Sequence, residues 1–182
     1  MSSKKISPTW TDVKAKLSGC DREGVLTLLR DLYAVSDENK AFMHARFNLG
    51  ADVLSPYKTA LTRWLWPDIS RGQKLSVSKA KKAIADYKKA VGRPGDMAEL
   101  MTFYCEQAVG FCREVGFSDE TLFVSLMGMF GQSLKLTVIL EPIERGSLLE
   151  RLHEVSRLSQ DFGNGFRDEM DDLLADHSTS TE

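Results

Sequence analysis

The sequence predicts an all-α protein, a single multi-helix domain of about seven to nine helices arranged as a bundle or an irregular stack. Apolar residues recur at spacings of three and four through most of the chain, whereas alternating strand patterns are nearly absent. Capping residues, prolines and glycines separate these periodic segments. The 182 residues can bury one core, and an apolar share of 42% with a charged share of 27% is typical of a soluble globular protein.

The first two helices are predicted from the residues that start them. Ser7 and Pro8 suit the N-cap and the first position of a short helix that ends at about Leu17. Asp21 can cap a second helix. The apolar residues of this second helix lie three or four apart, as one helix face requires: Val25, Leu28, Leu29 and Leu32.

The next two helices are predicted between Ser36 and Pro67. The first starts at Ser36 or Asp37, and its apolar face is formed by Phe42, Met43 and Phe47. The second covers residues 49–66, where Pro56 must start the helix or kink it. Pro67 ends this helix because the residue before a proline is disfavoured in helical conformation.

A loop over residues 67–76, centred on Gly72, precedes a helix that is rich in lysine. The lysine helix covers residues 76–92 (SVSKAKKAIADYKKAVG) and ends at Gly92. Asp96 is predicted to open the next helix, which continues to about Val115.

A long apolar segment follows, with Ser118 and Thr121 at its start and Pro142 near its end. Residues 143–158 form another helix, and about 166–176 form a last one. The predicted organisation is an N-terminal tail (1–8), a helical domain (9–160) and an acidic C-terminal segment (161–182) that is partly helical or frayed.

The apolar run over residues 122–140 is long enough to cross a membrane. It contains Lys135, which costs about 2.5–3.5 kcal/mol near the centre of a span, so a central helix of a soluble core is the better prediction. No apolar run of signal-peptide length follows the N-terminus. Three cysteines without framework spacing indicate a reduced, cytoplasmic protein.

Charge is distributed unevenly along the chain. The net charge is +2 over residues 1–70, +7 over residues 71–93 and −11 over residues 94–182. Such asymmetry carries information about partners rather than about fold. The candidate partner-binding residues are the eight basic residues of the middle segment: Arg71, Lys74, Lys79, Lys81, Lys82, Lys88, Lys89 and Arg93.

On a helical wheel, the lysine helix has an apolar stripe and a broad basic face. The stripe consists of Val77, Ala80, Ile84, Tyr87 and Val91. Lys81 and Lys88 flank it, and the other three lysines lie further round with Asp86. The basic face is either an ordinary solvated surface, a surface covered by the acidic last third of the chain, or a binding surface. Its possible ligands are an acidic protein, nucleic-acid phosphate bound without sequence reading, or, third, anionic lipid.

Catalytic and metal-binding patterns have little support. Cys105 and Cys112 lie seven apart on one helix, without the companion ligands of a zinc site, and are predicted to be buried apolar residues. Glu99 and Glu106 are also seven apart and could share a face, but nothing sets their environments apart. His44 is predicted to be a packed histidine with a hydrogen bond. We expect no enzyme activity, no metal and no cofactor.

The chain resembles an uncharacterised, mainly bacterial, all-helical family that is known only as a domain of unknown function. The resemblance covers about residues 9–158. It is carried by VLTLLRDLYAVSDENKAFMHARF (25–47), Trp66-Pro67, the lysine helix, ELMTFYCEQAVGFCREVGFSDETLFVSLMGMF (99–130) and RLHEV (151–155). The resemblance implies one helical domain that includes the lysine helix, and it implies no activity or cofactor.

The expected function is therefore macromolecular contact, with the basic segment 71–93 as the interaction surface. An acidic protein surface is the first expected partner. Contact with nucleic-acid phosphate through the helix 76–92 is the alternative.

Overall fold

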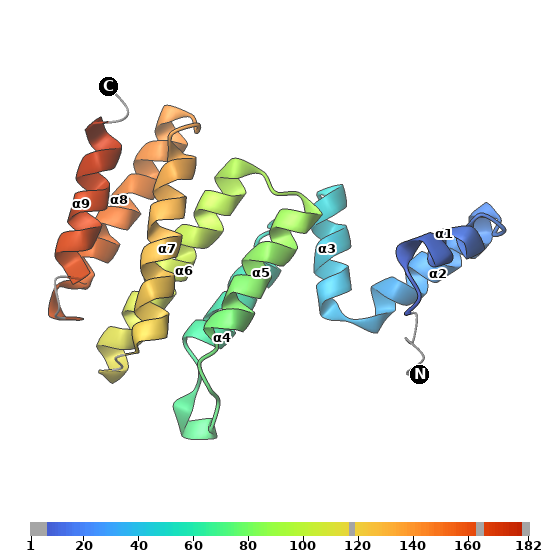
Figure 1. The fold of residues 1–182 in the computed structure, drawn as a ribbon, viewed down its shortest axis with the longest axis horizontal. Coiled ribbons are helices and arrows are strands. Elements are labelled where there is room, and N and C mark those ends of the chain that lie inside the picture. The colour runs from blue at the N-terminus through green and yellow to red at the C-terminus, as the bar shows by residue number, and fades with distance from the viewer. Residues whose placement is uncertain (1–6, 117–118, 163–165, 180–182) are drawn as a thin grey trace, which may run out of the picture. The chain divides into compact units, whose positions relative to one another are not determined.

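The computed structural model describes residues 7–116, 119–162 and 166–179 (Figure 1). Within these ranges the chain forms nine α-helices and no strand, which confirms the predicted all-α class. No helix in the described ranges is both long and apolar enough to span a membrane. The chain divides into two compact units, residues 1–43 and 44–182, a division that the sequence pattern did not predict.

The first unit contains helices α1 (Trp10–Leu17) and α2 (Arg22–Val35). The prediction that Ser7 and Pro8 start α1 is wrong by two residues. Thr9 is the N-cap, and its backbone N–H donates to the Asp12 carboxylate at 2.7 Å. Asp21 caps α2 as predicted and accepts a hydrogen bond from the Gly24 N–H at 2.8 Å.

The boundary between the units lies inside α3 (Asp37–Phe47), and the second unit contains the remaining helices. These are α4 (Ser55–Leu65), α5 (Val77–Ala90), α6 (Pro94–Val115), α7 (Glu120–Thr137), α8 (Pro142–Leu158) and α9 (Phe166–Thr179). A short 3₁₀ turn, Ile69–Arg71, lies in the loop before α5. Helix α4 begins at Ser55, with Pro56 in its first turn, so the predicted start at residue 49 is wrong by six residues. The chain leaves the helical conformation at Trp66, directly before Pro67, as predicted.

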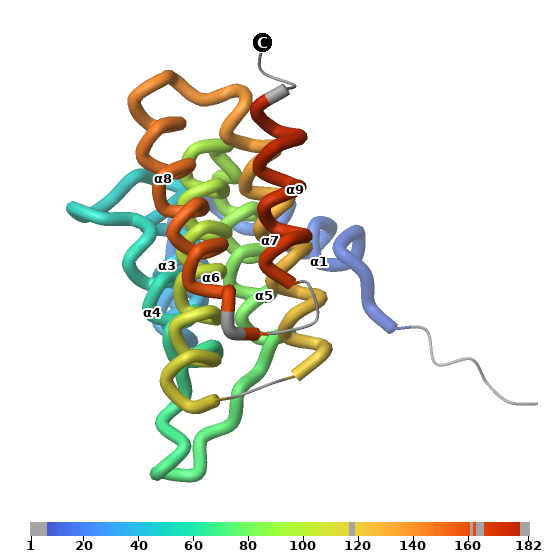
Figure 2. The backbone as a smooth tube through the Cα atoms, turned by 90° about the vertical axis from the view of Figure 1, so that its left-hand side faces the viewer, coloured from blue at the N-terminus to red at the C-terminus, as the bar shows by residue number. Residues whose placement is uncertain are grey.

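Helices α4 to α9 form a stack of three helical hairpins in two layers. One layer contains α4, α6 and α8, and the other contains α5, α7 and α9 (Figures 1 and 2). Helix α6 is central because it packs on α4, α5, α7 and α8. The predicted stack is therefore present in the second unit.

The core of the second unit lies mainly between α6 and α7. Its largest fully buried side chains there are Leu100, Tyr104, Phe111, Leu122, Leu126 and Phe130. Buried hydroxyl groups are paired across the interface: Thr102 with Ser133, and Tyr104 with Ser125, each at 2.8 Å. Pairing of this kind removes the cost of burying a polar group.

Several predicted helix boundaries are corrected. Helix α6 begins at Pro94, and Asp96 lies in its first turn. The predicted start at Ser118 lies outside the described residues. Asp119 is the N-cap of α7 and accepts from the Leu122 N–H at 2.8 Å.

The last helix was predicted to be partly frayed. Within the described residues, α9 extends to Thr179 and packs on α7 and α8. It does so through Phe166, Met170 and Leu174, which are buried. These residues lie four apart, so they form one apolar edge on an otherwise acidic helix.

Candidate interaction surface on α5 and α7

Helix α5 is held by its caps and by one buried edge. The Ser76 hydroxyl accepts from the Lys79 N–H at 3.4 Å, and Gly92, in the left-handed conformation at φ 69°, follows the last turn. A side chain at Gly92 would meet the Lys88 carbonyl oxygen at 2.8 Å. The buried residues of α5 are Ala80, Ala83, Ile84, Tyr87 and Ala90. The predicted stripe is correct at its centre, but its ends, Val77 and Val91, are only half-buried.

All eight predicted partner-binding residues are exposed. Five of them, Lys79, Lys81, Lys82, Lys88 and Lys89, lie on α5, and Arg71, Lys74 and Arg93 lie beside its ends. The acidic helix α9 packs on α7 and α8, on the far side of α7 from α5 (Figure 1). Within the described residues, the acidic last third of the chain therefore leaves the basic face uncovered.

Four of these basic groups have an acidic neighbour. Lys82 and Lys89 both pair with Asp86, the latter at 3.9 Å. Arg93 donates to Asp96 at 2.6 Å, and Asp96 also accepts from the buried Tyr87 hydroxyl. Arg71 pairs with Asp68 at 3.2 Å. These contacts are local, so they reduce the positive potential of the face only in part.

Lys79 has an aromatic partner that the sequence analysis missed. Its ammonium lies 4.0 Å from the centre of the Trp64 ring, and the Arg63 guanidinium lies 5.0 Å from the same ring. The Ser76 N–H donates to the Trp64 carbonyl at 2.9 Å, which closes the loop between α4 and α5. This closure brings Trp64 to Lys79, and no spacing pattern within α5 could have indicated it.

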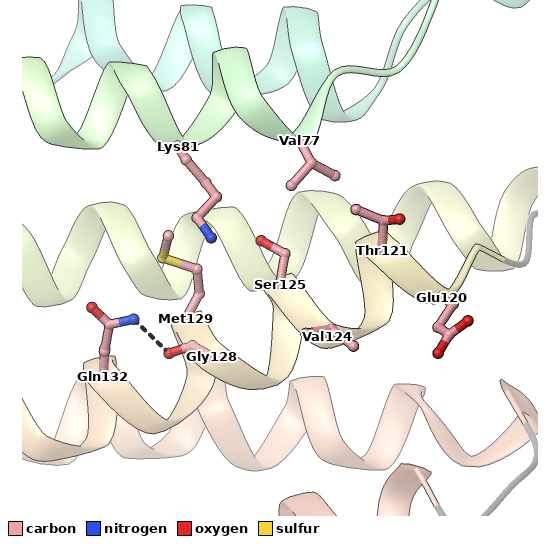
Figure 3. Close-up of a pocket in the computed structure, with 9 residues that line it drawn as sticks. All are labelled: Val77, Lys81, Glu120, Thr121, Val124, Ser125, Gly128, Met129 and Gln132. Atoms are coloured by element: carbon pink, nitrogen blue, oxygen red, sulfur yellow. Dashed lines mark hydrogen bonds between the residues drawn. The ribbon is translucent and has the colours of Figure 1, made fainter.

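Three ammonium groups remain, on Lys74, Lys81 and Lys88. None of them forms an ion pair with any residue in the described part of the chain. Lys81 and Lys88 are seven residues apart, so they lie on the same side of α5, about 10 Å apart along the helix axis. This side is the one that faces α7, because Lys81 reaches into the groove between the two helices (Figure 3).

The groove between α5 and α7 has a volume of about 400 Å³. Figure 3 shows Val77 opposite Thr121 and Lys81 above Met129, so the two helices run in the same direction. The α7 wall carries one acidic group, at its N-terminal end, and otherwise neutral side chains. The lining residues are Val77, Lys81, Glu120, Thr121, Val124, Ser125, Gly128, Met129 and Gln132.

Val124 and Gly128 give the α7 side of the groove an exposed apolar side chain and a position without a side chain. Val124 is 68% exposed, unusually high for a valine in the middle of a helix. A side chain added at Gly128 would meet nothing within 4 Å, so the helix backbone is open to the groove there. The Gln132 amide folds back and donates to the Gly128 carbonyl at 2.9 Å (Figure 3).

A second groove, of about 470 Å³, lies on the other side of α7, against α9. Gly128 and Gln132 line both grooves, and this one also contains Lys135, Glu169 and His177. Across the α5/α7/α9 layer, the surface therefore changes from basic on α5, through nearly neutral on α7, to acidic on α9.

Glu99 and Glu106 share a face of α6 as predicted, and an arginine that the sequence analysis missed joins them. Arg151 on α8 binds Glu106 through two hydrogen bonds, of 2.7 and 2.8 Å, and also binds Glu99. Lys58 on α4 pairs with Glu99 at 2.6 Å. Burial raises the pKa of Glu99, but hydrogen bonds from Arg151 and Lys58 outweigh it and leave that pKa below its ordinary value. This network joins α4, α6 and α8.

The remaining candidate groups are two cysteines and a histidine. Cys105 and Cys112 are buried, as predicted, and burial raises the pKa of the Cys112 thiol to about 11. His44 is half-buried, also as predicted. In the described ranges, no cluster of three or more histidine, cysteine or acidic side chains could hold a metal ion.

The first unit carries an apolar face that the sequence analysis assigned to helix packing. On α2, Leu26, Leu28, Leu29 and Leu32 are each between 41% and 52% exposed, and Val35 is 75% exposed. Neither α1 nor α2 has a buried residue. Of the predicted face, Leu28, Leu29 and Leu32 are exposed and Val25 is half-buried, so within its own unit this face covers no core.

Comparison of the chain with models of protein families, with curated proteins and with solved structures finds no match.

Proposed function

We propose that the protein is a non-enzymatic binding module that holds an acidic partner protein on the basic face around α5. One observation carries this proposal. All eight basic residues are exposed, and three of them lack a counterion among the described residues. Uncompensated charges of one sign attract a partner of opposite sign and speed its association.

The arrangement of the helices supports the same function. Stacks of helical hairpins present adjacent parallel helices, and the grooves between such helices are common binding surfaces. Here the basic helix and the nearly neutral α7 lie side by side in one layer (Figure 1). The three free cysteines fit a reducing compartment, and we propose a cytoplasmic location.

Nucleic-acid phosphate is the alternative ligand, because the same ammonium groups would bind it. The structure favours a protein partner for a specific reason. Non-specific binding of single strands uses exposed aromatic rings on which bases stack. The ring that contacts the basic face, Trp64, is half-buried and is covered by Lys79 and Arg63.

Fluorescence anisotropy with three labelled probes tests the proposal: a polyglutamate-rich peptide, duplex DNA and single-stranded RNA. The decisive variant is Lys74→Glu/Lys81→Glu/Lys88→Glu. The matched control, Lys14→Glu/Lys16→Glu/Arg22→Glu, reverses three exposed charges in the first unit. Circular dichroism checks that both variants remain helical.

We expect the acidic peptide to bind the wild type and the control, and to bind the decisive variant at least about tenfold more weakly. A steep salt dependence for DNA or RNA, with tighter binding than the peptide, would favour the alternative instead. Equal binding by all three proteins, or no binding to any probe, would refute the basic face as a binding surface.

A further inference from the structure

We propose that the groove between α5 and α7 binds one face of an acidic amphipathic helix from the partner protein. This inference rests on the proposed function and specifies the chemistry of the partner. It follows from three properties of the groove: its length, its apolar wall and the sign of the charges along it.

The groove has the dimensions of a helix site. Its α7 residues extend from Glu120 to Gln132, about 18 Å at the helical rise of 1.5 Å per residue, or three turns. Both walls are α-helices, whose backbone groups are already bonded within each helix. An extended peptide binds mainly by pairing with free backbone groups, and these walls offer none in their central turns. A helix, in contrast, binds through side chains alone.

The apolar contacts lie at helical spacing. Val124 and Gly128 are four residues apart on α7, the polar Gln132 follows four residues later, and Val77 on α5 faces them from the opposite wall. Because Gly128 has no side chain and no close neighbour, an incoming helix can approach the α7 backbone there. Val124, at 68% exposure, has apolar area that such a helix would bury.

The charges define which helix fits. Lys81 reaches into the groove from α5, and Lys88 lies on the same side of α5 two turns later. The single acidic lining group, Glu120, is at the opposite end, at the start of α7. A helix with carboxylates along the α5 side therefore meets two ammonium groups, and its acidic residues are disfavoured only near Glu120.

The acidic helix of a second copy is a poor occupant. Helix α9 carries five acidic residues, but its apolar edge, formed by Phe166, Met170 and Leu174, is already buried in its own fold. It could offer carboxylates to α5 but no apolar face to α7. The occupant we infer is therefore a helix of another protein.

Three labelled peptides of about 18 residues, long enough to form a helix, test the inference on the full-length protein. The first has leucines at i, i+4, i+7 and i+11 and glutamates elsewhere. The second has the same composition in an order that destroys the leucine face. The third keeps the leucine face and replaces every glutamate by lysine.

Two substitutions at Gly128 test the α7 wall of this groove, a wall that Gly128 also presents to the second groove. Gly128→Leu adds a large side chain at a position where a Cβ alone would meet nothing within 4 Å, and Gly128→Ala, which adds only the Cβ, is the control. We expect the first peptide to bind the wild type at least about tenfold more tightly than the second or third. Gly128→Leu should remove this preference, and Gly128→Ala should weaken it much less.

Equal binding of the two acidic peptides would overturn the groove inference and leave the proposed function intact, since charge alone would then suffice. An unchanged preference in Gly128→Leu would also overturn it. Failure of both acidic peptides to bind would refute the proposed function itself. Should Gly128→Leu abolish a concentration-dependent self-association seen by sedimentation, the occupant is a second copy and the inferred partner is wrong.

Discussion

The guanidinium of Arg151 on α8 binds the carboxylate of Glu106 on α6 with two parallel hydrogen bonds, of 2.7 and 2.8 Å. This geometry is the strongest form of a side-chain ion pair because both donors and both acceptors are aligned. The same guanidinium also binds Glu99, so one side chain holds two carboxylates on the central helix.

Arg151→Leu should therefore destabilise the protein by about 1–3 kcal/mol, as expected for loss of charged hydrogen bonds at a partly exposed site. Urea unfolding followed by circular dichroism measures the change. Arg157→Leu on the same helix is the control, because Arg157 pairs with Glu154 at an exposed position and its loss should give little change. Equal effects of the two substitutions would show that the network does not hold α6 and α8 together.

Two glycines inside helices should respond to alanine in opposite ways. At Gly110 on α6, an added Cβ would lie 2.4 Å from Cζ3 of the Trp66 ring, so the ring must move. We expect Gly110→Ala to destabilise by about 1–3 kcal/mol, as overpacking does. At Gly128 the added Cβ meets nothing within 4 Å, and Gly128→Ala should stabilise by up to about 1 kcal/mol through helix propensity.

Thermal unfolding of the two glycine variants beside the wild type measures whether Gly110→Ala lowers stability and Gly128→Ala raises it. The tryptophan fluorescence of Gly110→Ala should also shift, because Trp66 is the side chain that is displaced. A stabilised Gly110→Ala would mean that α6 and Trp66 are not in close contact.

His177 on α9 should make stability depend on pH. Its Nε2 lies 2.9 Å from the Thr137 hydroxyl. Burial and the nearby Arg145 lower the pKa of His177 below its ordinary value. The folded state therefore binds the proton less readily than the unfolded chain, so stability is fully present above the ordinary pKa of about 6.5 and is lost as pH falls below it.

Guanidinium unfolding at several pH values between about 5 and 7.5 measures this dependence. His177→Gln keeps a hydrogen-bonding group but cannot be protonated, so its free energy of unfolding should vary less with pH in this range. A variant as pH-dependent as the wild type would show that His177 is not the source of the effect.

The same leucine-to-alanine change should have very different costs in the two units. Leu126 on α7 is fully buried, and Leu126→Ala should destabilise by about 2–5 kcal/mol. Leu32 on α2 is 45% exposed, and Leu32→Ala should stay within about 0.5 kcal/mol of the wild type. Chemical denaturation measures both, and a large loss for Leu32→Ala would show that the α2 face is covered in solution.

The amino-acid sequence alone determined where most of the helices lie and which side of a helix such as α5 is apolar. Spacings of three and four, together with caps such as Asp21 and Ser76, are local features, and helical hydrogen bonds are local as well. The centre of the buried stripe on α5, and therefore the basic face opposite it, followed from the same periodicity. Starts such as Pro94 were displaced by two residues because several nearby residues can cap a helix.

Only the tertiary structure decided which helices meet. The contact of Lys79 with Trp64, the clamp of Arg151 on two glutamates, and the groove shared by α5 and α7 join residues that are 15 to 55 positions apart. The acidic α9 packs on α7 and α8 rather than over the lysines, and the leucine face of α2 is left exposed. These outcomes depend on the path of the chain between helices, which periodicity within a helix does not specify.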